Sequence, residues 1–205
     1  MYLGASFNDV AMGKNKSVIV VGGGIVGLST AYFLRKAGHQ VTVLDKSDIS
    51  SGASFVNAGY LTPSHIVSLA SPGMITQGLK YMFNSSSPFY MKPRLDPDFI
   101  RWAWLFKKSA TQTKVERSMS VIRDINLLSR ELYEEIQVSG DLGDFQIGNQ
   151  GLMMVYQTEK ARDHEMKVVE KAAKMGLVGK HLSKSDLKTI ELHVDFNVEG
   201  AILCE

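Results

Sequence analysis

Short apolar runs and a stretch with helical spacing alternate along the first part of the chain. Residues 17–21 form one run rich in β-branched side chains, and residues 41–44 form a second. Both runs predict buried strands, because continuous β-branched segments pack well in a parallel sheet. Between them, residues 25–37 place apolar side chains at helical spacing and stop at Gly38. Strand, helix and strand within about thirty residues predict a βαβ unit.

The turn between the first strand and the helix carries a G-x-G-x-x-G motif at residues 22–27. In such a turn, Gly22 permits the sharp change of direction, Gly24 lets a pyrophosphate approach, and Gly27 lets the helix pack on its strand. Helix N-termini favour anions. Asp45 follows the second strand, where a carboxylate can accept hydrogen bonds from a ribose. We therefore predict a dinucleotide site, the alternative being a βαβ unit with an ordinary surface aspartate.

Residues 46–63 are mostly small, polar or turn-forming. A loop of this length in a compact domain is usually functional or disordered. Small side chains allow a large flat ligand to approach the backbone closely, which favours a cofactor-binding loop. Ordinary turn chemistry is the alternative, because Ser, Asn and Gly are also the commonest turn residues.

The middle of the chain predicts helices. A short helix is expected over residues 74–83, and a long one over residues 113–138, where apolar residues recur at three- and four-residue steps. Between them, Asp96-Pro97-Asp98 is a typical helix start. The strongly apolar residues 99–106 that follow predict a buried helix at a domain junction. The alternative is an interfacial helix that touches membrane lipid or a partner subunit.

The last part of the chain mixes strands and helices. Residues 152–156 predict a strand, and residues 159–175 predict a charged helix that stops before a glycine. Ser183, with Asp186 three residues later, predicts the N-terminal cap of a short helix. Residues 198–204 predict a further strand.

Three segments make the chain resemble the D-amino-acid oxidase superfamily of FAD-dependent oxidoreductases. They are the glycine motif after the first strand, the acid at Asp45, and residues 51–61, which read Ser-Gly-Ala-Ser-Phe-Val-Asn-Ala-Gly-Tyr-Leu. The resemblance runs from about residue 17 to residue 205. Within the superfamily the chain is most similar to the N-terminal half of the small subunit of bacterial D-amino-acid dehydrogenases.

The resemblance implies that the glycine turn and the following loop bind FAD. Gly22, Gly24 and Gly27 would hold the pyrophosphate, and Asp45, where most relatives have Glu, would hold the ribose. The other implied positions are Ile25 and Val26 within the motif, Lys46 beside the adenosine, Ser50, Ser51 and Ser54 for phosphate or ribitol contacts, and Asn57, Ala58, Gly59 and Leu61 along the flavin ring. No catalytic residue is assigned within this chain.

The same resemblance implies an α/β architecture. It consists of an FAD-binding Rossmann-like domain, a helical segment and the start of an α+β substrate domain. Because the relatives are longer, the chain resembles a truncated, N-terminal fragment. The expected division is a disordered extension over 1–16, the N-terminal part of the FAD-binding domain over 17–70, a helical segment over 71–145 and an incomplete substrate domain over 146–205.

Composition argues against several other functions. The 23 basic and 21 acidic residues give a net charge of +2, which makes no electrostatic case for nucleic acid. The single cysteine excludes an internal disulfide, and the five histidines show no metal-ligand spacing. No apolar run is long enough to span a bilayer. The lack of an export signal favours the cytoplasm, and the family resemblance adds a loose contact with the inner membrane or an electron acceptor.

The expected function is oxidation of the CH–NH2 group of a small amino-acid substrate, with D stereochemistry. The product would be an imine and then a 2-oxo acid, and the electrons would pass through FAD to a respiratory acceptor. One alternative is a related flavin oxidase or dehydrogenase of glycine, sarcosine, proline or glycerol 3-phosphate. Another is a non-catalytic, truncated FAD-binding fragment.

Overall fold

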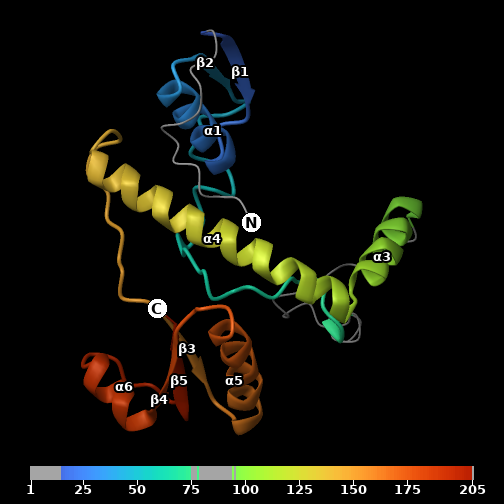
Figure 1. Cartoon of the computed structure of the whole chain (residues 1–205), viewed down its shortest axis with the longest axis vertical. Coiled ribbons are helices and arrows are strands. Elements are labelled where there is room, and N and C mark those ends of the chain that lie inside the picture. Colours follow the sequence, from blue (N-terminus) through green and yellow to red (C-terminus); the bar gives the residue numbers. More distant parts are fainter. Residues whose placement is uncertain (1–14, 75–77, 79–93, 95, 205) are drawn as a thin grey trace. The chain divides into compact units, whose positions relative to one another are not determined.

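The computed structural model describes residues 15–74, 78, 94 and 96–204 (Figure 1). The chain divides into two compact units, Met1–Tyr60 and Leu61–Glu205. The predicted extension over 1–16 and the predicted helix over 74–83 lie largely outside the described residues. The four-part division of the chain stays a prediction.

The first unit is the predicted βαβ arrangement. β1 (Ser17–Val21) leads into α1 (Ile25–Lys36), and β2 (Gln40–Leu44) pairs in parallel with β1 (Figure 1). The register places Ser17 opposite Gln40 and Val21 opposite Leu44. Since both strands run the same way, their carboxyl ends and the start of α1 lie at one edge of the sheet.

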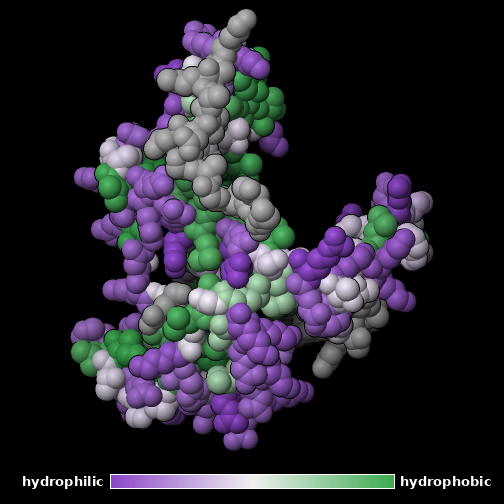
Figure 2. Space-filling model, viewed as in Figure 1, coloured by the Kyte–Doolittle hydropathy of each residue, from purple (hydrophilic) through white to green (hydrophobic). Residues whose placement is uncertain are grey.

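Apolar side chains on this two-stranded sheet remain exposed. Ile19 is 65% exposed and Val21 is 84% exposed. Figure 2 shows the corresponding hydrophobic patch over β1. Parallel sheets normally have both faces covered. The first unit therefore buries little of its own apolar surface, and its stability depends strongly on how α1 and the glycine turn pack.

The second unit contains an antiparallel sheet in the order β3-β5-β4. Its strands are β3 (Leu152–Tyr156), β4 (Gly179–Ser183) and β5 (Gly200–Cys204). β5 is central, and four of its five residues are buried, which explains why this strand is almost wholly apolar. α5 (Glu159–Ala173) packs against all three strands. The predicted strands near residues 152–156 and 198–204 are confirmed.

β4 is a strand that the sequence pattern does not predict. It reads Gly-Lys-His-Leu-Ser, and only Leu182 is fully buried, with 1% of its surface exposed. Lys180 and His181 are exposed, so no apolar alternation marks the segment. The strand forms because it satisfies the second edge of β5. As an edge strand of this sheet, it can leave polar side chains in water.

α6 (Lys184–Ile190) begins with the predicted cap. Ser183 N–H donates to Asp186 Oδ2 at 2.8 Å, and Asp186 N–H donates to Ser183 Oγ at 3.3 Å. These bonds form a capping box, which satisfies two helix-end donors at once. The hydrogen bonds from Ser183 also hold the pKa of Asp186 below its usual range.

Two consecutive helices precede the sheet of the second unit, α3 (Pro97–Ser109) and α4 (Gln112–Ser139) (Figure 1). Both were predicted, and Asp96 caps α3 as expected. α4 contributes to a core cluster together with α5, the segment after α5 and a segment that precedes α3. The buried members of this cluster are Ile66, Val115, Met119, Ala172 and Leu177. α3 buries no residue. The prediction of a buried helix is therefore wrong in this structure.

Candidate functional site

The glycine turn joins β1 to α1 at the carboxyl edge of the sheet. Gly22 has a φ of +104°, a conformation that favours glycine. Its N–H donates to the carbonyl oxygen of Leu44 at 2.7 Å. This hydrogen bond therefore joins the turn to the end of β2, in addition to its covalent connection to β1.

Gly27 lies in the first turn of α1 and packs against the turn that precedes it. A Cβ atom at this position would collide with the carbonyl oxygen of Gly22. The same atom would lie 3.4 Å from Cγ1 of Val20. Only a residue without a side chain allows α1 to approach β1 this closely, which is the role that the motif predicts for its third glycine.

Asp45 links the glycine turn to the loop after β2. Its Oδ2 accepts a hydrogen bond of 2.6 Å from Gly23 N–H. Its Oδ1 accepts two bonds of 2.8 Å, from the backbone N–H and the hydroxyl of Ser47. The bond from Gly23, followed by those from Ser47, lowers the pKa of Asp45. The side chain is consequently a carboxylate at neutral pH, held at the sheet edge.

Through Ser54, the loop after β2 contacts the N-terminus of α1. Its Oγ accepts a hydrogen bond of 3.0 Å from Ile25 N–H. Gly24, the N-cap residue, offers no side-chain cap of its own. A Cβ on Gly24 would lie 3.2 Å from Ser54 Oγ. The absence of a side chain on Gly24 therefore makes room for a polar group at the helix end.

The sequence pattern does not predict three of the residues at this site. Gly23 and Ser47 supply the hydrogen bonds to Asp45. The third is Ile49, whose Cγ1 lies 2.8 Å from the position of a Cβ on Gly23. Ser47 could have been found, because a residue two positions after Asp often closes an Asx turn. Ile49 carries no such signal, and its φ of +68° is unusual for a β-branched residue.

Gly22–Gly27, Asp45, Ser47 and Ser54 form one hydrogen-bonded cluster. Among the described residues, most of the remaining predicted positions make no contact with this cluster. Asn57 accepts a bond of 2.7 Å from Gly59 N–H, which closes a local turn. Lys46 contributes only a favourable charge beside Asp45. Leu61 begins the second unit. Val26 lies within the turn itself. Within the described part of the chain, no polar contact joins the turn to the other predicted positions, namely Ser50, Ser51 and Ala58.

The cluster fits the pyrophosphate and ribose of a dinucleotide such as FAD. The end of α1 presents backbone N–H groups, and its first turn contains no acidic residue. Ser54 adds a hydroxyl at the same place. Asp45 adds an ionised carboxylate close by. An anion could bind at the helix end while the carboxylate accepts hydrogen bonds from ribose hydroxyls.

Two further features bear on chemistry. Among the described residues, no group of three or more His, Cys, Asp or Glu side chains is placed to hold a metal ion. The helices in that same part of the chain are all too short or too polar to cross a membrane.

The chain belongs to the DAO family of FAD-dependent oxidoreductases, whose family model matches residues 17–205. It is 33% identical over 188 residues to a D-amino acid dehydrogenase of Helicobacter pylori, covering 92% of this chain and 44% of that protein. It is also 33% identical to a D-amino acid dehydrogenase of Vibrio atlanticus, over 71% of this chain and 35% of the relative. The chain thus spans less than half the length of these curated relatives.

Two solved structures share the fold. A glycine oxidase from Bacillus cereus matches with a TM-score of 0.52 and 17% identity, over 92% of this chain and 37% of that one. A glycine oxidase from Geobacillus kaustophilus matches with a TM-score of 0.53 and 21% identity, over 92% and 38%. The mixed α/β structure is therefore part of a DAO fold, as the predicted class requires.

Replacing Asp45 by Asn should weaken flavin binding on the order of tenfold, because the amide presents one acceptor where the carboxylate presents two. Titration with FAD, followed by flavin fluorescence, measures this. Asp48→Asn is the matched control, since Asp48 is exposed in the same loop and loses the same charge. Equal affinities for the two variants would contradict the assignment of Asp45.

The lowered pKa of Asp45 also predicts how flavin affinity should change with pH. The Asp45 side chain stays a carboxylate below the ordinary carboxyl pKa of about 3.9 and becomes protonated only as pH falls through the lowered value. Flavin affinity should therefore be insensitive to this group near neutral pH. A decrease on the acid side should be smaller in Asp45→Asn than in the parent chain.

Proposed function

We propose that this chain is the cofactor-binding part of an FAD-dependent dehydrogenase of small D-amino acids. The observation that carries the proposal is the turn of residues 22–27, joined to Asp45 through Gly23 and to Ser54 through Ile25. The names of the relatives, D-amino acid dehydrogenases at 32–33% identity, support the substrate class.

In the proposed reaction the amino acid loses a hydride from Cα and a proton from nitrogen, which leaves an imine. Water then hydrolyses the imine to a 2-oxo acid and ammonia. Bound FAD would supply the hydride acceptor, and a respiratory carrier would finally take the electrons. The residues of this chain would bind and orient the cofactor: the α1 N-terminus and Ser54 at the pyrophosphate, and Asp45 at the ribose.

The test is flavin retention followed by substrate reduction. The purified chain is titrated with FAD, and D-alanine is then added without oxygen. Bleaching of the flavin absorbance by D-alanine, with none by L-alanine, supports the proposal. A bound flavin that neither D-alanine nor other small D-amino acids bleach contradicts the substrate class while leaving the cofactor assignment intact.

A second candidate is a flavin oxidase of glycine, favoured by the likeness of the fold to the two glycine oxidases. Bleaching by glycine or sarcosine alone would favour it. Rapid reoxidation by oxygen would also point to an oxidase, whereas reoxidation only by a quinone analogue would point to the dehydrogenase. Retention of flavin with bleaching by none of these substrates would favour the non-catalytic FAD-binding fragment, and failure of the chain to retain any flavin would contradict the proposal itself.

A further inference from the structure

Ile49, in the loop after β2, has an unfavourable backbone conformation. Its φ is +68°, and among the described residues it is the only one besides glycine with a positive φ. The left-handed region brings Cβ too close to the backbone, and β-branched side chains are especially rare there. Such a conformation persists only where surrounding contacts hold it, and functional sites commonly supply those contacts. The contacts of the Ile49 side chain therefore indicate why the chain retains it.

The side chain of Ile49 lies over Gly23 in the glycine turn. A Cβ atom on Gly23 would lie 2.8 Å from Ile49 Cγ1 and 3.1 Å from Ile49 Cδ1. Ile49 thus occupies the space that a side chain on Gly23 would need. Gly23 is buried, whereas Gly24 beside it is exposed. Because Ile49 is itself 45% exposed, one side of its side chain covers the turn and the other side faces water.

The covered point lies next to the hydrogen bond that holds Asp45. Gly23 N–H donates to Asp45 Oδ2 at 2.6 Å, and this oxygen lies 3.3 Å from the same Cβ position that Ile49 flanks. An apolar side chain at this point limits the access of water, and a hydrogen bond to a charged group is stronger where water competes less. This bond is also the largest cause of the lowered pKa of Asp45. Asp45 is otherwise exposed, so a ligand can still reach its carboxylate.

We propose that Ile49 is a positioning residue of the cofactor site, whose side chain covers the hydrogen bond from Gly23 to Asp45 and keeps that carboxylate aimed at the ribose of FAD. The inference rests on the proposed function for the identity of the ligand. The unfavourable φ of residue 49 is retained because it directs the side chain over the turn. Stability and cofactor affinity should therefore respond differently when this residue is replaced.

Two substitutions separate the cover from the backbone strain. Ile49→Asn relieves the strain, because asparagine adopts a positive φ more readily, and it removes the apolar cover. Ile49→Leu also removes the β-branch but keeps an apolar side chain. Both variants should unfold at the Tm of the parent chain or above it. The affinity for FAD should fall about tenfold in Ile49→Asn, the equivalent of one hydrogen bond to a charged group, and stay close to that of the parent in Ile49→Leu.

Flavin fluorescence during titration with FAD measures the affinities, and circular dichroism measures Tm. Ile190→Asn is the matched control, because Ile190 is 46% exposed on α6 and undergoes the same chemical change outside the site. It should bind FAD like the parent chain. Equal affinities of Ile49→Asn and Ile49→Leu would overturn the proposal. A Tm of Ile49→Asn below that of the parent would show that Ile49 has a structural role instead.

Hydrogen exchange of the Gly23 amide tests the cover without any cofactor, because exchange reports how often this N–H opens to water. Nuclear magnetic resonance of the flavin-free chain should show faster exchange of Gly23 in Ile49→Asn and the parent rate in Ile49→Leu. An unchanged rate in Ile49→Asn would disprove the cover even if FAD binds. If the parent chain binds no FAD, the proposed function fails, and the exchange of Gly23 still decides whether Ile49 covers this bond.

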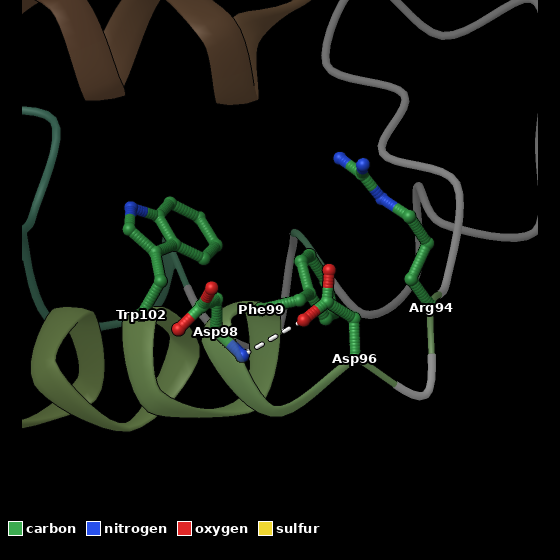
Figure 3. Close-up of a pocket in the computed structure, with 5 residues that line it drawn as sticks. All are labelled: Arg94, Asp96, Asp98, Phe99 and Trp102. Atoms are coloured by element: carbon green, nitrogen blue, oxygen red, sulfur yellow. Dashed lines mark hydrogen bonds between the residues drawn. The ribbon is translucent and has the colours of Figure 1, made fainter.

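A hollow at the start of α3 offers another place where a flat anion such as FAD could adhere. It measures about 380 Å³, and Arg94 Cζ lies 5.9 Å from the centroid of the Phe99 ring. Figure 3 shows the rings of Phe99 and Trp102 projecting from the same side of the helix. Arg94→Gln removes the cation from this hollow and should leave FAD affinity unchanged. If Arg94→Gln lowers the affinity and Ile49→Asn does not, FAD binds at the hollow and the role of Ile49 is disproved.

Discussion

Gly27→Ala is expected to weaken flavin binding by the chain roughly a hundredfold. The added methyl group would collide with the carbonyl oxygen of Gly22, and a backbone atom cannot rotate away as a side chain can. α1 would have to move off β1, which would open the turn that holds the cofactor. Overpacking of this kind costs about 3 kcal/mol, equivalent to roughly a hundredfold in affinity. Titration with FAD and thermal unfolding followed by circular dichroism measure the two effects.

Gly52→Ala is the matched control for this variant. Gly52 lies in the same unit, and a Cβ there would meet no atom within 4 Å. The control should bind flavin and unfold like the parent chain. If Gly27→Ala also behaved like the parent, the close approach of α1 to β1 would not be essential, and the glycine turn would lose its assigned role.

The second large effect is expected at Gly200, the first residue of the central strand β5. A Cβ there would collide with the Tyr156 hydroxyl and lie 2.7 Å from the carbonyl oxygen of Leu182. The tyrosine passes over Gly200 to form a hydrogen bond of 2.6 Å with His181 Nε2. Gly200→Ala should therefore destabilise the second unit by about 2 kcal/mol, which lowers Tm by about 6 °C for a domain of this size.

A double variant identifies the cause of that loss. Tyr156→Phe removes the hydroxyl that the new methyl group would meet, so adding it to Gly200→Ala should cost less than the sum of the two single changes. Gly148→Ala, where a Cβ would have open space, controls for the loss of a glycine. Strict additivity of the two substitutions would show that the contact with the Tyr156 hydroxyl is not responsible.

The sequence predicts most helices and strands, because each has a local signal in the form of apolar spacing or a helix cap. α1 and α4 follow apolar residues at helical spacing, and α3 and α6 begin at caps that the sequence displays. β4 was missed because only one apolar side chain marks it. Its conformation comes from pairing with β5, a partner about twenty residues away in the chain, and no local pattern encodes that pairing.

The residues of the candidate site also fall into those that the sequence predicts and those that it does not. Gly22, Gly24, Gly27 and Asp45 were predicted because the motif fixes their spacing. Gly23 and Ile49 were missed, because their importance arises only when the loop after β2 folds back over the turn. The predicted flavin-facing positions around Asn57 stay a prediction, since the hydrogen bond of Asn57 itself is local, with Gly59 N–H.

The sequence by itself determined the βαβ unit, the glycine turn and the acid at its edge, because short-range spacing dictates these features. Only the tertiary structure decided which groups hold Asp45, where β4 pairs, and that the apolar α3 is left uncovered. Hydrogen-bond partners and burial depend on residues distant in sequence, and they are set by how the elements pack. The glycine turn is therefore a property of the sequence, whereas the hydrogen bonds that hold Asp45 and the exposure of α3 are properties of the fold.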